Sequence, residues 1–418
     1  LSSRYYKDYK FTSVAGELNS HIGQHLSNML RATYSFQDQP RSSEYGDQPT
    51  LEIVMDNGQG IYPTWAYTGC DLFTVGNLVQ TKNAVVTDEL TLNRGRHNAI
   101  FGLQYEWDRA ANGYTQAAAG YYAFAATPEQ VAAGDWASVF GTAPRVFGIG
   151  YGNNEGHSQY TATMNVHNFS AYVQDNWDIS RRFKLSYGLR VELPVYPDLK
   201  DNYNEAYYNL DFGGQHYRTD QTPDARLSFS PRVGFNWDVL GNRRFVLRGG
   251  SGLFVGRIPY SWLVSSVLNS GMGQTTTVLR AAKGNAMPQY ADGSYFSANR
   301  EEMLAAIGAT SKTSIPSSPT ILASDLKNPT TWKSSLAADF RLPGDVDFSV
   351  EGLYSRELNP VVVGNRDIYW DGSSTVTLSP YDTRRSYSYY DPNYSCYVLE
   401  NAGRKAYYWS ITASLRKS

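Results

Sequence analysis

The sequence predicts an all-β protein, a partial transmembrane antiparallel β-barrel with long extracellular loops. Two observations predict this fold class. Segments of about ten residues alternate between apolar and polar side chains, as strands do when one face meets apolar surroundings and the other meets water. The connections between these segments alternate between tight turns and long loops, and loops of such length are uncommon in compact soluble domains.

Residues 97–108 show the alternation most clearly. Their odd-numbered positions form an apolar face: Ala99, Phe101, Leu103, Tyr105 and Trp107. Their even-numbered positions form a polar face: Gly102, Gln104, Glu106 and Asp108. The same period predicts eleven strands along the chain, at residues 14–23, 28–37, 79–92, 97–108, 167–178, 183–193, 226–239, 244–256, 331–341, 346–356 and 405–416.

The connections are of two kinds. Tight turns are predicted near residues 24–27, 93–96, 179–182, 240–243 and 341–345. Long loops are predicted at 38–78, 109–166, 194–225, 257–330 and 357–404. A bacterial outer-membrane barrel has short turns on its inner side and long loops outside, so we expect the Gram-negative outer membrane as the location and its lipid as a partner.

Composition excludes several other classes. The 418 residues carry 37 Lys and Arg against 39 Asp and Glu, so bulk charge gives no reason to expect nucleic acid as a partner. Aromatic residues make up 14% of the chain, too many for a disordered protein. The longest nearly apolar run, residues 117–126, is about half as long as a spanning helix requires.

The polar faces of the predicted strands carry charges that we expect to face the barrel lumen. These residues are Glu106, Arg190, Arg232, Asp238, Arg248, Lys333 and Asp339. A charge on the lipid face costs about 2–4 kcal/mol at mid-depth of the bilayer. Because all these charges fall on the polar side of the strands, they support the predicted assignment of faces. Pairing among these charges or with a plug is one interpretation, and direct contact with a substrate is the other. We expect the opposite face to meet lipid through Phe101, Leu103, Leu185, Leu189, Phe235 and Phe340.

Aromatic residues gather in two other places. Five tryptophans near strand ends predict a girdle at the lipid headgroups: Trp107, Trp177, Trp237, Trp332 and Trp409. Tyrosines of two long loops form a candidate ligand-binding set: Tyr114, Tyr121, Tyr122, Tyr387, Tyr389, Tyr390 and Tyr394. Tyrosine offers a large apolar ring with a polar tip, which suits a binding surface, although packing of the loops against each other is the alternative.

Two short helices are predicted within the loops. Thr127 is followed by Pro128 and, three positions on, by Gln130, which is typical of a capped helix start. Asn299 opens a similar segment that ends near Gly308. We expect both helices to pack the loops.

Two predicted hairpins resemble a known family. Residues 167–192, HNFSAYVQDNWDISRRFKLSYGLRVE, resemble the hairpin of TonB-dependent outer-membrane receptors in which a Y-x-Q-D-x-W strand precedes an L-x-Y-G-L-R strand. Residues 227–257, LSFSPRVGFNWDVLGNRRFVLRGGSGLFVGR, resemble the S-P-R-x-G-F and L-R-G-G-x-G-x-F hairpin of the same family. The continuation IPYSW at 258–262 is similar to the Oar-like branch from the Bacteroidetes, whose members often carry a carboxypeptidase-regulatory-like domain.

The resemblance implies a function. Members bind a scarce nutrient outside the cell and import it with energy that TonB passes from the inner membrane. The resemblance therefore implies uptake of an unknown small nutrient or peptide, a plug in the lumen, and a TonB contact through an N-terminal segment. Neither plug nor contact segment is recognisable here, so we expect residues 1–418 to be a fragment of a single barrel. In the intact protein, strands 14–23 and 405–416 would each pair with a further strand.

No catalytic site is expected. The six histidines show no metal-ligand spacing, and no nucleophile motif is present, so we expect neither an enzyme nor a metal or organic cofactor. The alternative to transport is a surface-interaction protein whose loops bind a partner without import. Cys70 and Cys396 both fall in predicted outer loops, where they form either a disulfide or two free thiols.

Overall fold

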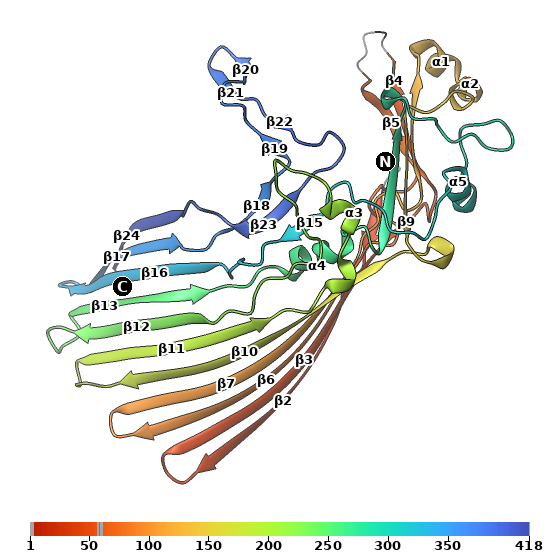
Figure 1. The fold of residues 1–418 in the computed structure, drawn as a ribbon. Coiled ribbons are helices and arrows are strands. Elements are labelled where there is room, and N and C mark those ends of the chain that lie inside the picture. The colour runs from red at the N-terminus through yellow and green to blue at the C-terminus, as the bar shows by residue number, and fades with distance from the viewer. Residues whose placement is uncertain (1–3, 57, 59–61, 418) are drawn as a thin grey trace.

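The computed structural model describes residues 4–56, 58 and 62–417, and its main feature is one large, curved antiparallel sheet (Figure 1). The sheet has twelve strands. They are β1 (Tyr5–Lys7), β2 (Lys10–Ile22), β3 (Leu26–Ser43), β6 (Leu78–Arg94), β7 (His97–Gly113), β10 (Thr161–Trp177), β11 (Phe183–Val195), β12 (Ser228–Asp238), β13 (Phe245–Val255), β16 (Thr330–Leu342), β17 (Val346–Glu357) and β24 (Tyr407–Lys417).

From β2 onward, each strand of the large sheet pairs with the next large-sheet strand along the chain. Strand β1 pairs with β3 and continues β2 along the same side of it. All eleven predicted strands are present, so the predicted fold class is confirmed. The sheet is not closed: within the described residues, β2 and β24 are its two edges and do not pair with each other. Figure 1 shows them at opposite margins of the sheet, β2 in red and β24 in blue.

The register confirms that the polar and apolar sets lie on opposite faces. Glu106 of β7 lies opposite Asn168 of β10, and Leu103 lies opposite Ala171, so the two sets stay separate from strand to strand. The apolar face, here called the outer face, exposes large side chains such as Leu103, which is 64% exposed. All six residues expected to meet lipid belong to this face: Phe101, Leu103, Leu185, Leu189, Phe235 and Phe340. The five tryptophans of the predicted girdle also belong to it: Trp107, Trp177, Trp237, Trp332 and Trp409.

The tight turns join neighbouring strands at one end of the sheet. Gly95 joins β6 to β7 with φ of 64°, and Gly241 joins β12 to β13 with φ of 76°, a backbone region that favours glycine. The long loops all leave from the opposite end, as predicted. Several strands extend further in that direction than the sequence predicts; β3 reaches Ser43 because it pairs with β1 on one side and with β6 nearly as far on the other.

The long loops fold into structure of their own. Three of them supply a five-stranded sheet made of β4 (Thr50–Met55), β5 (Thr64–Thr68), β8 (Tyr121–Ala126), β9 (Val146–Gly152) and β14 (Gln274–Arg280). Tyr122, Phe124 and Phe147 are fully buried at its centre. These segments are predicted as loops, because so short a strand shows too few alternations to be recognised.

The loop at 357–404, together with β15 (Thr320–Leu322) from the loop at 257–330, forms a smaller sheet and a projecting arm. The smaller sheet contains β15, β18 (Val361–Asn365) and β23 (Tyr397–Asn401). The arm consists of two hairpins, β19 (Ile368–Tyr369) with β22 (Ser388–Tyr389) and β20 (Thr375–Ser379) with β21 (Asp382–Arg385). Figure 1 shows this arm projecting from the loop end, well apart from β4 and β5.

Both predicted helices are present. Helix α1 (Pro128–Ala133) begins with the reciprocal hydrogen bonds between Thr127 and Gln130, and α5 (Arg300–Ala306) begins with Asn299 accepting from the backbone N–H groups of Glu301 and Glu302. The structure also contains α2 (Trp136–Phe140), α3 (Glu205–Tyr208) and α4 (Tyr260–Leu268), which the sequence does not predict. Among the described residues, no helix is both long and apolar enough to cross a membrane.

Candidate functional site

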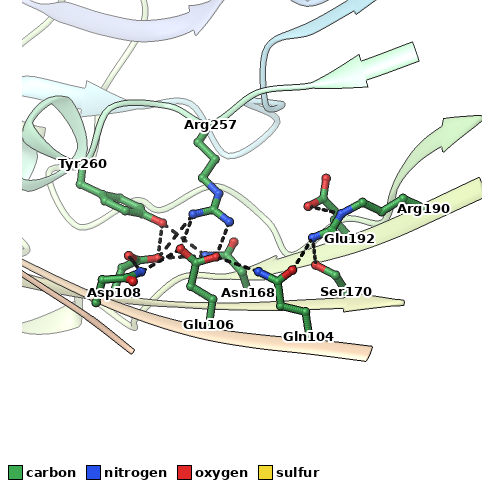
Figure 2. Close-up of polar contacts among 10 residues, drawn as sticks. Gln104, Glu106, Asp108, Asn168, Ser170, Arg190, Glu192, Arg257 and Tyr260 are labelled. Atoms are coloured by element: carbon green, nitrogen blue, oxygen red, sulfur yellow. Dashed lines mark hydrogen bonds and ion pairs between the residues drawn. The ribbon is translucent and has the colours of Figure 1, made fainter. Parts of the chain in front are cut away.

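Helix α4 lies on the polar face of the sheet, here called the inner face. Its side chains Leu263, Val264 and Val267 share one buried cluster with Met164 and Val166 of β10. The loop segment before α4 brings Arg257 over β7 (Figure 2). An apolar helix can sit on a polar sheet face here because the loop end of β10 carries Ala162, Met164 and Val166 at the inner positions.

A polar network fixes the start of α4 to β7. Arg257 donates to both carboxylate oxygens of Glu106, and Tyr260 donates to Oδ2 of Asp108 at 2.6 Å. Asn83 of β6 donates to Glu106 at 2.8 Å and to Asp108 at 2.7 Å. Figure 2 shows Arg257, from the loop before α4, and Tyr260, from the start of α4, reaching down to these two carboxylates.

Burial and charge make this network strong. Glu106 and Asp108 are 5% and 3% exposed, so the two carboxylates depend on these donors in place of water. The hydrogen bond to Glu106 raises the pKa of the Arg257 guanidinium, and burial raises the pKa of the Tyr260 phenol. Arg257 therefore stays charged, and Tyr260 stays a hydrogen-bond donor.

A second group lies beside the first on β11. The guanidinium of Arg190 donates to Glu192 at 3.0 Å, to Gln104 at 3.2 Å and to the Ser170 hydroxyl at 2.9 Å (Figure 2). The same guanidinium lies over the ring of Tyr172, 5.3 Å from the ring centroid.

The remaining polar-face charges also have partners, either within the sheet or in an adjoining turn. Arg248 forms ion pairs with Asp339 at 2.9 Å and Glu351 at 3.6 Å. Arg232 and Lys333 both lie over the ring of Phe254, 4.9 and 5.6 Å from its centroid. Asp238 accepts from backbone N–H groups of its turn, those of Gly241 and Arg243. All seven charges expected to face the lumen thus lie on the inner face, each with a partner on the sheet or in an adjoining turn.

The loop tyrosines fall into separate groups. Tyr122 is fully buried, its hydroxyl bonded to that of Tyr290, so it packs the loops in this structure instead of presenting a binding surface. Tyr121 donates to Glu52, which joins β8 to β4. Tyr387 and Tyr389 are exposed on the arm, while Tyr390 stacks near Tyr369 with ring centroids 4.7 Å apart. Tyr394 packs against the cluster of Tyr207 and Phe212.

A polar cavity of about 310 Å³ lies among three loops beside the end of α4. Its lining contains Tyr114, which belongs to the predicted set, and residues that the sequence analysis missed: Gln116, Leu268, Asn269, Gly271, Gln274, Thr276, Val278 and 314–318. These residues are scattered between positions 114 and 318, with four strands of the large sheet between them, and no sequence pattern links them. Tyr114 also stacks on Phe73, with ring centroids 6.0 Å apart.

The cysteines are both buried and free. Cys396 lies in the cluster of Tyr207, and burial raises the pKa of its thiol to about 11. Burial also raises the pKa of Cys70. Across the described part of the chain, no group of three or more His, Cys, Asp or Glu side chains is arranged to hold a metal ion.

Comparison with known proteins gives a family match over nearly the whole chain. Residues 3–418 match the model described as an outer membrane beta barrel domain. No curated protein matches the chain. Among solved structures, the outer membrane transporter YddB from Escherichia coli is similar with a TM-score of 0.56 and 12% identity, over 99% of this chain and 40% of that one.

Two other solved structures are less similar in shape. The siderophore receptor PirA from Acinetobacter baumannii has a TM-score of 0.45 and 11% identity, over 98% of this chain and 42% of that one. The copper transporter OprC has a TM-score of 0.47 and 10% identity, over 97% and 43%. The chain thus spans about 40% of the length of the solved structures that it matches.

Proposed function

We propose, from the premise that this chain belongs to the family of outer membrane beta barrel domains, that it forms part of a receptor or transporter for ligand-gated, TonB-coupled nutrient uptake. Its location is the outer membrane. The similar fold of an Escherichia coli outer membrane transporter supports a transport role. The TonB contact, a plug in the lumen and the Oar-like branch suggested by residues 258–262 are parts of the same proposal.

The observation that carries the proposal is the ordered loop layer. Strands from three separate loops form one sheet with a buried aromatic centre, and α4 is fixed to the inner face by Arg257 and Tyr260. A loop layer that only shielded the barrel from solvent would not require a helix anchored on the polar face. In this proposal the inner face lines the lumen, and its paired charges form the wall past which a ligand moves.

The test compares uptake with and without the protein. Cells that carry the protein, cells that lack it, and cells with inactive TonB are grown in one defined nutrient mixture, and depletion of each nutrient is followed by mass spectrometry. We expect one nutrient class to be depleted only when both the protein and active TonB are present. Equal depletion in all three strains would contradict the proposal.

The exposed arm favours a second candidate function, surface interaction. Tyr381 is 99% exposed at its tip, and Leu378 and Tyr389 are also exposed. Exposed apolar residues at the end of a projecting hairpin are typical of a protein contact. Deleting residues 371–387 would abolish adhesion to a partner surface if this function is the main one, and would leave uptake unchanged.

A further inference from the structure

We propose that the polar cavity beside α4 binds a neutral, polyhydroxylated ligand, a saccharide. This inference rests on the proposed uptake function, whose substrate class it names. The cavity has a volume of about 310 Å³, at the lower end of the range typical of small-molecule sites. It is lined from the loop that follows β7, the end of α4, β14 and residues 314–318.

The hydrogen-bonding groups of the cavity divide into two sets. The first set holds the wall together: Gln274 accepts from Thr115 at 2.8 Å and donates to the Tyr114 carbonyl at 3.1 Å, and Ser314 bonds to Thr275 at 2.8 Å. The second set consists of side chains that make no hydrogen bond or ion pair with the described part of the protein. They are Tyr114, Gln116, Asn269, Thr276, Ser317 and Ser318.

The unused groups share one chemical property, because all six are uncharged hydroxyls or amides. Amides and hydroxyls both donate and accept, so they match sugar hydroxyls, which also do both. Among the described residues, no Asp, Glu, Lys or Arg lines the cavity, and an anionic ligand would lack the cationic partners that usually bind carboxylates and phosphates. An entirely apolar ligand would leave the amides of Gln116 and Asn269 without partners, which is unfavourable.

Apolar groups in the lining suit the same ligand. Leu268, Ile315 and Pro316 line the cavity together with the ring of Tyr114. The C–H face of a sugar ring packs on such surfaces while its hydroxyls point to the polar groups. A cavity with both features recognises a sugar better than a small ion.

The network of Figure 2 keeps this site in place. Leu268 and Asn269 stand at the end of α4, and the start of α4 is fixed to β7 by Tyr260 and Arg257. Leu268 is also buried in the cluster that includes Met164 of β10. One wall of the cavity is thus rigidly connected to the inner face of the sheet.

The experiment measures binding to the purified full-length protein. The protein in detergent is applied to an array of neutral oligosaccharides, and the affinity of the best binder is measured by calorimetry. The double variant Asn269→Leu/Thr276→Val removes two unused polar groups at nearly constant volume, and we expect it to weaken binding about tenfold or more. Thr377→Val removes an exposed hydroxyl on β20, outside the cavity, and serves as the matched control with unchanged affinity.

The outcomes separate this inference from the proposed function. Binding that the double variant weakens, with its β-sheet circular dichroism unchanged, supports the inference even if the uptake experiment finds no transport. Failure of every neutral oligosaccharide to bind overturns the inference, and so does an affinity that the double variant leaves unchanged. Uptake of a charged nutrient would then still support the proposed function.

Discussion

Arg257 shows what a single residue contributes to this molecule. Its side chain is half-exposed, yet its guanidinium forms an ion pair with Glu106, which is almost fully buried. The same guanidinium lies 4.0 Å from Asp108. The strand period alone places Glu106 on the polar face. Nothing in the sequence points to Arg257 as its partner, since the two are 151 positions apart and Arg257 lies in an irregular loop.

We expect Arg257→Gln to lower the free energy of unfolding by about 2 kcal/mol at neutral pH, because it removes the charge that compensates a buried carboxylate. Urea unfolding in detergent measures the effect. Arg226→Gln is the matched control: its ion pair with Asp224 is exposed on both sides, so its loss should cost at most about 0.5 kcal/mol. Equal effects of the two variants would contradict the account of the network.

Cys396 gives a second residue-scale prediction. Its pKa of about 11 in the folded protein exceeds the ordinary value of a thiol, about 8.5. The folded state therefore keeps the proton that the unfolded state loses, so Cys396 contributes stability in full below about pH 8.5 and loses it as the pH rises toward 11. In the folded protein, we expect Cys396 to react slowly with a thiol reagent at pH 8. After unfolding without reductant, we expect two reactive thiols per chain. Fewer than two would indicate that Cys70 and Cys396 are paired.

At the scale of elements, the eleven strands were predictable because the two faces of each strand meet different surroundings. Polar and apolar side chains therefore alternate along the sequence with a period of two. Helices α1 and α5 were predictable from their caps at Thr127 and Asn299. Helix α4 was not, because it has no capping side chain and is buried on several sides, so it shows no clean polar face. The strands of the loop sheet were missed because each has only five to seven residues and shows too few alternations, and because some pair only with distant segments, as β14 does with β9.

A cross-strand pair within the sheet gives a prediction at this scale. Gly102 of β7 lies directly opposite Tyr172 of β10, and a Cβ atom at Gly102 would stand 2.0 Å from the Tyr172 ring. The ring is held over this position by a hydrogen bond to Glu89 at 2.8 Å. Gly102→Val should therefore displace the ring and lower the free energy of unfolding by about 1–3 kcal/mol.

Gly16→Val is the matched control for this prediction. Gly16 is also inside a strand, β2, and nothing lies within 4 Å of the Cβ position. We expect its effect to be close to zero or slightly stabilising, since valine favours strands. The same urea titration measures both variants, and a larger loss for Gly16→Val would contradict the steric explanation.

At the scale of the whole molecule, the open edges of the sheet have the largest energetic consequence. Strand β2 pairs only with β3, and β24 only with β17, among the described residues. In a bilayer, each unpaired N–H or C=O group along such an edge costs several kcal/mol, and a strand exposes several of them. Their sum exceeds the roughly 5–15 kcal/mol by which a whole protein is stable. An outer-membrane barrel must therefore pair both edges.

Two ways of pairing the edges are distinguishable by cross-linking. If β2 and β24 close a small barrel together, cysteines at outer-face positions such as Leu18 and Ile411 would come within disulfide distance in at least one register. If further strands complete a larger barrel, the two edges stay apart, because those strands lie between them. The side chains of Leu18 and Ile411 are 61% and 70% exposed, so substitution there leaves no packing defect.

We propose the larger barrel, and expect no cross-link between Leu18→Cys and any of several single cysteines along β24 in oxidised outer membranes. Leu18→Cys with Leu30→Cys, which lie opposite each other on β2 and β3, is the positive control. Efficient cross-linking of β2 to β24 would instead establish a small closed pore.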